Sequence, residues 1–107
     1  MYDLVKYLIP IINRFPRGYK FTLGDRMTNL VLDLLEQYIA AYYTSNQKAK
    51  IDILNSNNLQ LERIRFLIRL SHDFKLFSNQ RFGYICGLVD EIGKMNGGWL
   101  KQLRNRK

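Results

Sequence analysis

Most of the residues in this 107-residue chain that could do chemistry are cations, and one group of these cations is placed among aromatic rings. Between positions 14 and 26, four cations alternate with three rings and face a single carboxylate, Asp25; the cations are Arg14, Arg17, Lys20 and Arg26, and the rings are Phe15, Tyr19 and Phe21. A guanidinium group binds phosphate through paired hydrogen bonds, and a flat ring stacks on an unpaired base. The segment therefore predicts binding of single-stranded or irregular RNA.

Further cations follow in two later segments. Arg63, Arg65 and Arg69 lie in a helical pattern, where Arg65 and Arg69 are one turn apart and share a face. Carboxylates at positions 62 and 73 are available to them, so phosphate binding and structural ion pairing are equally good interpretations. A basic C-terminal tail at about 101–107 is typical of a solvated arm that could also wrap a phosphate backbone; it contains Lys101, Arg104, Arg106 and Lys107.

Residues suited to catalysis are scarce. His72 and Cys86 are the chain's only soft metal ligands, fewer than a metal site needs. His72 is interpreted as a solvated or locally hydrogen-bonded side chain, and Cys86 as a small buried hydrophobe without a neighbouring base. The glycines near the C-terminus lack the Lys-Ser or Lys-Thr ending of a phosphate loop. We predict no catalytic residue, no metal and no cofactor.

The overall composition sets limits on the fold class and the partners. A chain of this length predicts one domain, residues 1–107, and a hydrophobic fraction of 47% is too high for a disordered segment. Seventeen Lys and Arg against nine Asp and Glu give a formal charge of +8, which favours acidic partners, although solubility alone is an alternative explanation. A single cysteine, no signal-peptide pattern and no membrane-length apolar run predict a cytoplasmic protein that does not enter membranes.

Four helical segments must position these residues. The apolar spacing predicts a first helix over residues 2–13, with a kink at Pro10 or an end near Ile9, and then a loop over residues 15–21. Thr22 and Asp25 fit a capping box at the start of a second helix. Its apolar stripe runs through Leu23, Met27, Leu30, Val31, Leu34, Leu35, Tyr38, Ile39 and Tyr42.

The second half of the chain predicts two more helices. The third has a soft spot of weak helix formers at residues 55–58, and the fourth starts after a Ser78 cap and is interrupted at Gly97-Gly98. The apolar stripe of this fourth helix runs through Phe82, Ile85, Leu88, Val89, Ile92, Met95 and Trp99. We expect Phe15 and Phe21 to anchor the first loop to the bundle, and we expect four aromatic residues to lie in the core or at an oligomer interface: Phe15, Tyr19, Phe21 and Trp99. The predicted fold is all-α, an antiparallel up-and-down four-helix bundle.

Three segments together resemble a known family. They are FPRGYKFTLGDR at residues 15–26, LERIRFLIRL at 61–70 and IGKMNGGWL at 92–100, in an order that covers nearly the whole chain. The chain resembles the accessory variability determinant proteins of diversity-generating retroelements. More distantly, it is similar to the four-helix-bundle proteins encoded by intervening sequences in bacterial large-subunit ribosomal RNA, which are structural oligomers with general RNA affinity.

The resemblance implies a fold, an assembly and partners. It implies a four-helix bundle that forms a homopentameric ring and binds the reverse transcriptase of its own element together with RNA, or with DNA or an RNA/DNA hybrid, to support mutagenic retrohoming. The positions in the matching motifs become candidates for polymerase or nucleic-acid contact, none of them catalytic: Arg14, Arg17, Lys20, Arg26, Arg63, Arg65, Arg69 and Lys94. Lys101 and Arg104 of the tail are candidates on charge alone.

Three hypotheses follow from the sequence. The first is a reverse-transcriptase accessory protein, which should lose binding when Arg17 and Arg26 are exchanged for Glu. The second is a purely structural oligomer whose charge serves solubility, which predicts no RNA complex even at low salt. The third, a small nuclease, requires ligands or acid-base groups that the sequence does not offer.

Overall fold

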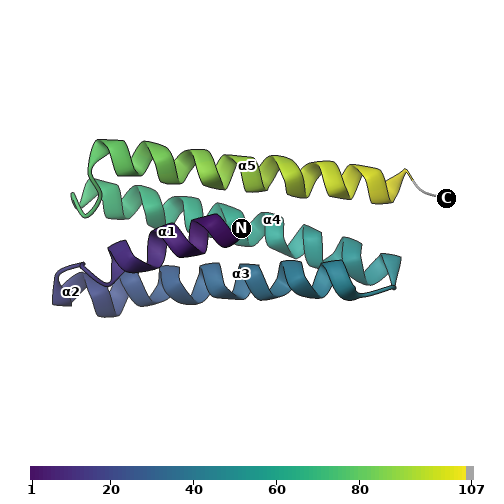
Figure 1. Ribbon diagram of the computed structural model, residues 1–107, viewed down its shortest axis with the longest axis horizontal. Coiled ribbons are helices and arrows are strands. Elements are labelled where there is room, and N and C mark those ends of the chain that lie inside the picture. The colour runs from purple at the N-terminus through teal and green to yellow at the C-terminus, as the bar shows by residue number, and fades with distance from the viewer. Residues whose placement is uncertain (106–107) are drawn as a thin grey trace.

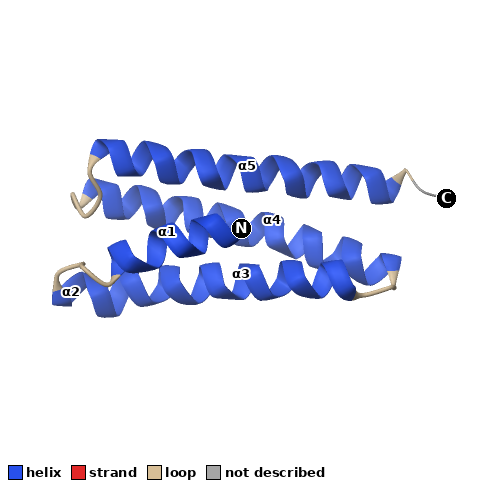
Figure 2. Cartoon of the chain, in the orientation of Figure 1, coloured by secondary structure: helices blue, strands red, loops and turns tan. Residues whose placement is uncertain are grey.

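A computed structural model describes residues 1–105, and helices are the only regular elements in that range (Figure 2). Four of them lie side by side and alternate in direction, as Figure 1 shows: α1 (Tyr2–Ile12), α3 (Asp25–Tyr43), α4 (Gln47–Asp73) and α5 (Asn79–Arg104). Helices α1 and α4 each pack against both α3 and α5. The predicted all-α, antiparallel four-helix bundle is therefore confirmed for the single chain, while the pentameric ring stays a prediction.

The first helix does not end at Ile9. It continues through Pro10 to Ile12, because Leu4, Leu8 and Ile12 form one buried stripe and Pro10 faces solvent. Proline lacks the N–H that would bond to the carbonyl group one turn earlier, and the buried stripe outweighs the loss of that bond.

The predicted loop at residues 15–21 is largely helical instead. Pro16 stands just before the short helix α2 (Arg17–Tyr19), which continues through a π-helical turn, η1 (Lys20–Gly24), into α3. The capping box at Thr22 was a wrong prediction, since Thr22 lies inside this helical run. Its hydroxyl group donates back to the carbonyl oxygens of Gly18 at 2.9 Å and Tyr19 at 3.3 Å.

The core has two apolar parts. The larger part includes Leu4, Leu8, Ile12, Phe15, Met27, Val31, Leu34, Leu61, Ile64, Ile68, Phe77, Ile85, Val89 and Ile92. The smaller part contains Ala41, Leu54, Leu100 and Leu103. Along each of α3, α4 and α5, one polar side chain stands between the two parts: Tyr38, Asn57 and Asn96. We call these three residues the polar layer.

Hydrogen bonds join the helices at the polar layer. The Tyr38 hydroxyl donates to Asn96 Oδ1 at 2.7 Å, and Asn96 Nδ2 donates to the Leu54 carbonyl at 3.1 Å and to Asn58 Oδ1 at 2.6 Å. The expected soft spot at residues 55–58 is thus part of a continuous helix α4, because two of its asparagines are used between helices: Asn58 accepts from Asn96, and Asn55 accepts from Arg104 at 2.9 Å.

Helix α5 is not interrupted at Gly97-Gly98. It continues to Arg104, because Leu100 and Leu103 are buried in the smaller part of the core. Lys101 and Arg104 are therefore helical rather than parts of a solvated arm, and the other two predicted tail cations, Arg106 and Lys107, lie outside the described residues. Met95, expected on the buried stripe, is 74% exposed, and the neighbouring Asn96 is buried in its place.

Helix α1 covers only part of the bundle's length, as Figure 1 shows. The bundle measures 50 × 22 × 19 Å, and α1 has 11 residues against 27 for α4. Beyond the start of α1, the ends of α3 and α5 face each other without a fourth helix. Tyr42, which lines this end and was expected on the buried stripe of α3, is consequently 70% exposed, and Ile39 of the same expected stripe is 50% exposed.

Candidate nucleic-acid interface

A groove between α3 and α4 brings two of the predicted cations together. It has a volume of about 480 Å³ and is lined by Arg26, Asn29, Leu30 and Asp33 of α3 and by Arg63, Phe66 and Leu67 of α4. We call it the arginine groove. Arg26 and Arg63 belong to different segments of the sequence, and the antiparallel packing of α3 on α4 places both on one surface.

Both arginines of this groove keep donors free for a ligand. Arg26 has no carboxylate within ion-pair distance among residues 1–105, and Arg63 makes one weak hydrogen bond, to Gln60 Oε1 at 3.4 Å. Asp33 also lines the groove but pairs with neither. Free guanidinium donors on both walls suit phosphate oxygens.

An exposed ring lies beside these arginines. Phe66 lines the arginine groove with 66% of its surface exposed, so one face is open to a planar group. Sequence reasoning missed Phe66 and Asn29. The signal for Phe66 was available, because it lies one position away from the apolar stripe and between Arg65 and Leu67.

A second group of cations lies where α2 and η1 precede α3. Arg14 and Arg17 are exposed there, and Lys20 Nζ lies 5.7 Å from the centre of the Phe21 ring, a cation–π arrangement. Arg26 is in the first turn of α3, so this group and the arginine groove share one end of the bundle.

The aromatic residues of the same segment have different environments. Phe15 is buried and meets Phe77 edge to face at 5.5 Å, and Tyr19 is half-buried with its ring 5.3 Å from that of Phe74. Phe21 is 59% exposed, so the expectation that it anchors the segment in the core is corrected. The helical path through η1 turns it outward.

The face between α4 and α5 is more balanced in charge. Arg65 forms ion pairs with Glu62 and with Asp90, the latter at 3.4 Å. Its guanidinium group packs over Gly93, where an added Cβ would stand only 2.9 Å from a guanidinium nitrogen. Lys94 lines a hollow of about 390 Å³ with these same carboxylates, and Arg69 shares a smaller one of about 240 Å³ with Arg65 and Asp90. For Arg65 the structure supports the ion-pairing interpretation.

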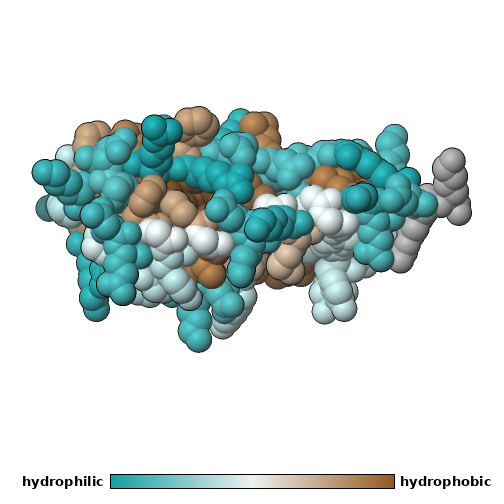
Figure 3. All heavy atoms as spheres, turned by 90° about the horizontal axis from the view of Figure 1, so that it is seen from above, coloured by the Kyte–Doolittle hydropathy of each residue, from teal (hydrophilic) through white to brown (hydrophobic). Residues whose placement is uncertain are grey.

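The remaining candidates lie at the far end of the bundle. Lys101 and Arg104 occupy the last turns of α5, and Arg104 is bonded to Asn55. The ten predicted cations thus divide among the α2 end, the arginine groove, the α4–α5 face and this far end. Figure 3 views the molecule from the α5 side, where hydrophilic side chains surround separate apolar areas.

The groups considered for catalysis have structural surroundings. His72 Nε2 is 2.8 Å from Asn79 Oδ1 and its ring stacks on Phe82 at 4.0 Å, a local arrangement. Burial raises the pKa of the Cys86 thiol, and the nearby Asp90 carboxylate adds to this, so the thiolate is disfavoured. Across residues 1–105, no three His, Cys, Asp or Glu side chains gather as metal ligands would. In the same range, every helix is too short or too polar to span a bilayer.

The fold and these surfaces define a class: a small, basic, all-α bundle that presents unpaired arginines in a groove. Comparison with known families gives a closer assignment. The model of the bAvd-like family matches residues 1–103, and the chain belongs to that family. A search among curated proteins gave no match.

Proposed function

We propose that this protein is a non-catalytic accessory protein of a diversity-generating retroelement. In this proposal it binds the element's reverse transcriptase together with nucleic acid, the RNA template or its cDNA, and so supports mutagenic retrohoming. Membership of the bAvd-like family supports the retroelement context. The proposal that it is not an enzyme agrees with the structural surroundings of His72 and Cys86.

The arginine groove is the observation that carries the nucleic-acid part. Arg26 and Arg63 supply unpaired guanidinium groups on opposite walls, and the exposed Phe66 ring offers a surface on which an unpaired base can stack. Contacts from guanidinium groups to phosphate carry no sequence information, so we expect these arginines to bind with low sequence specificity and strong salt dependence.

The assembly part of the proposal is a homo-oligomer, with the pentamer implied by the family resemblance. Multiplying the formal charge of +8 by five subunits gives +40, and such an assembly would attract nucleic acid over its whole surface. The reverse transcriptase would meet the assembly through cations outside the arginine groove, and we assign that contact to Arg14, Arg17 and Lys20 at the α2 end, where both arginines are exposed.

Charge reversal in the groove tests the nucleic-acid part. We expect Arg26→Glu combined with Arg63→Glu to weaken binding of single-stranded RNA at low salt by at least about a hundredfold, since each lost phosphate contact and each new repulsion costs on the order of 1 kcal/mol or more. Fluorescence anisotropy of a labelled RNA measures this. The control is Lys6→Glu with Arg81→Glu, which changes the net charge equally at exposed positions outside the groove.

Two results would count against the proposal. Equal weakening in the control pair would mean that total charge, and not the groove, holds the RNA. Failure of the protein to co-purify with the reverse transcriptase of its element, in lysates where both are expressed, would remove the accessory role.

A further inference from the structure

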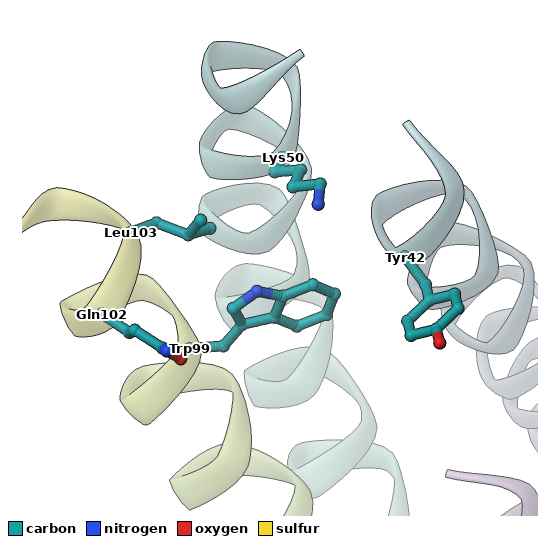
Figure 4. Close-up of a pocket in the computed structure, with 5 residues that line it drawn as sticks. All are labelled: Tyr42, Lys50, Trp99, Gln102 and Leu103. Carbon is teal, nitrogen blue, oxygen red and sulfur yellow. The ribbon is translucent and has the colours of Figure 1, made fainter. Parts of the chain in front are cut away.

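Two aromatic side chains face each other at the open end of the bundle, far from the arginine groove. Tyr42 of α3 and Trp99 of α5 form the walls of a hollow of about 380 Å³, with Lys50 of α4 beside them (Figure 4). Gln102 and Leu103 complete its lining. We call this hollow the aromatic site. Figure 4 shows the Trp99 indole reaching from α5 across α4 toward Tyr42.

The two rings are held differently. Trp99 is half-buried and packs against the smaller part of the core, so one side of the indole is fixed while the other stays open. Tyr42 is 70% exposed, because α1 starts too far along the bundle to cover this part of α3 (Figure 1). A larger neighbouring hollow of about 530 Å³ shares Tyr42, Trp99 and Gln102 with the aromatic site. The aromatic site therefore opens into this second hollow.

The charge around the aromatic site is positive. In the segments that form this end, residues 42–54 and 96–105, the cations are Lys48, Lys50, Lys101 and Arg104, and the one carboxylate is Asp52, which does not line the hollow. An apolar protein helix seated here would have to bury the Lys50 ammonium without a partner, which is costly. A polyanion with flat, unpaired rings matches both the charge and the aromatic walls.

We propose that the aromatic site binds one unpaired base of single-stranded nucleic acid between Tyr42 and Trp99. The Gln102 amide lies at the edge of the base, and Lys50 holds a phosphate next to it. This inference rests on the proposed function and adds to the arginine groove a second nucleic-acid contact point, near the opposite end of the bundle. A strand bound at both places would lie along the length of the molecule.

The fluorescence of Trp99 provides a direct test, because it is the only tryptophan of the chain. The probe is an oligodeoxythymidylate of about ten nucleotides, a length within the usual range for single-strand sites. Its partner probe is an abasic oligomer of the same length, which carries the same phosphates without bases. We expect the first to quench Trp99 at low salt, and the second to bind more weakly without quenching.

Two variants separate stacking from charge. Tyr42→Ala removes one wall at an exposed position and should weaken thymidylate binding about tenfold, as expected for the loss of one base–aromatic contact. Tyr2→Ala is the matched control, because Tyr2 is a tyrosine of similar exposure, 67%, and does not line the site or the neighbouring hollow. The control should bind and quench as the parent does. Circular dichroism should be unchanged in both.

The possible outcomes have distinct meanings. Binding seen by anisotropy without quenching, or equal quenching by the abasic oligomer, overturns the aromatic site and leaves the proposed function in place. A blue shift of Trp99 emission with protein concentration alone means that a second copy covers the site, which also overturns it. Absence of any nucleic-acid binding at low salt overturns both proposals.

Discussion

Two buried asparagines on neighbouring helices have opposite hydrogen-bonding environments. Asn96 makes three hydrogen bonds, to Tyr38, Leu54 and Asn58. Asn57 is fully buried, and its amide nitrogen and oxygen have no hydrogen-bond partner within residues 1–105. A buried amide without partners costs about 1–3 kcal/mol, whereas a fully bonded one is close to neutral. Leucine at these two positions should therefore have effects of opposite sign.

The first prediction compares these two substitutions. Asn57→Leu should raise the free energy of unfolding by about 1 kcal/mol, because it removes the unpaired amide and keeps the side-chain volume. Asn96→Leu should lower it by about 2–4 kcal/mol, because the Tyr38 hydroxyl and the Leu54 carbonyl lose their partner. Urea denaturation measures both. Stabilisation by both substitutions, or by neither, would contradict the hydrogen bonding described for the polar layer.

The Tyr38 hydroxyl makes stability depend on alkaline pH. Burial raises its pKa from 10.0 to about 12, and the nearby Asn57 amide, which does not reach hydrogen-bonding geometry with the hydroxyl, lowers the pKa only in part. The neutral hydroxyl is thus favoured in the folded chain, while the unfolded chain ionises near pH 10. The stability that this provides is complete below pH 10 and is lost as pH rises from about 10 to about 12.

The second prediction follows from that window. The parent should lose more stability between pH 9.5 and pH 11.5 than Tyr38→Phe does, since phenylalanine has no proton to lose. Urea denaturation across this range measures the difference between the two proteins, and other tyrosines and lysines contribute equally to both. A constant difference would mean that Tyr38 ionises in the folded and unfolded chains alike.

At the scale of helices, the apolar stripes in the sequence predicted the number of helices and their order. Boundaries were harder to predict, because long-range packing decided them. Pro10 in α1 and Gly97-Gly98 in α5 are both local signals for the end of a helix. Each helix continues past its signal, because Ile12 of α1 and Leu103 of α5 are buried against neighbouring helices. The π-helical turn has no signal in the sequence. Thr22 and Asp25 have the spacing of a capping box, so the sequence alone favoured a helix start at Thr22 over a continuous helical run.

The third prediction compares two helical glycines. At Gly97 nothing lies within 4 Å of an added Cβ, so Gly97→Ala should raise the free energy of unfolding by about 0.5–1 kcal/mol. At Gly24 a Cβ would stand 2.9 Å from Ile12 Cγ2 and 3.4 Å from the Tyr19 carbonyl oxygen, so Gly24→Ala should be destabilising. Thermal unfolding measures both. A stable Gly24→Ala protein would mean that η1 and α1 can move apart.

The candidate site was predictable only in part. The sequence identified Arg26 and Arg63 as single cations, but their pairing depends on how α3 lies against α4, which periodicity does not encode. From the sequence, Arg65 was as good a candidate for phosphate binding as Arg63. Its pairing with Asp90 depends on the contact between α4 and α5. The open end at Tyr42 was not predicted, although a short first helix was, because the apolar spacing of α3 placed Tyr42 on the buried stripe.

For the whole molecule, the length of α1 divides the bundle into a four-helix part and a three-helix part. The fourth prediction is that amide hydrogens of the three-helix part, at the end of α3, the start of α4 and the end of α5, exchange faster than those in the larger core, because fewer apolar side chains cover them. Hydrogen exchange followed by mass spectrometry measures this. Uniform protection along α4 would show that the two parts open together.

The fifth prediction concerns the salt dependence of RNA binding. The logarithm of the binding constant should fall linearly with the logarithm of salt concentration, and Arg26→Glu with Arg63→Glu should reduce that slope by about 1–2, since each phosphate contact on a single strand contributes about 0.7. The control pair at Lys6 and Arg81 should leave the slope near the parent value. An unchanged slope in the groove variant would mean that these arginines do not touch phosphate.

The polar layer has a consequence for axial alignment. Apolar side chains alone allow one helix to slip along another by a turn, about 5.4 Å, with little change in energy. Such a slip would separate Asn96 from Tyr38, Leu54 and Asn58 at once and leave buried polar atoms unpaired. The polar layer thus fixes the axial register of α3, α4 and α5. The same register keeps Arg26 of α3 opposite Arg63 of α4, although these two residues lie outside the layer.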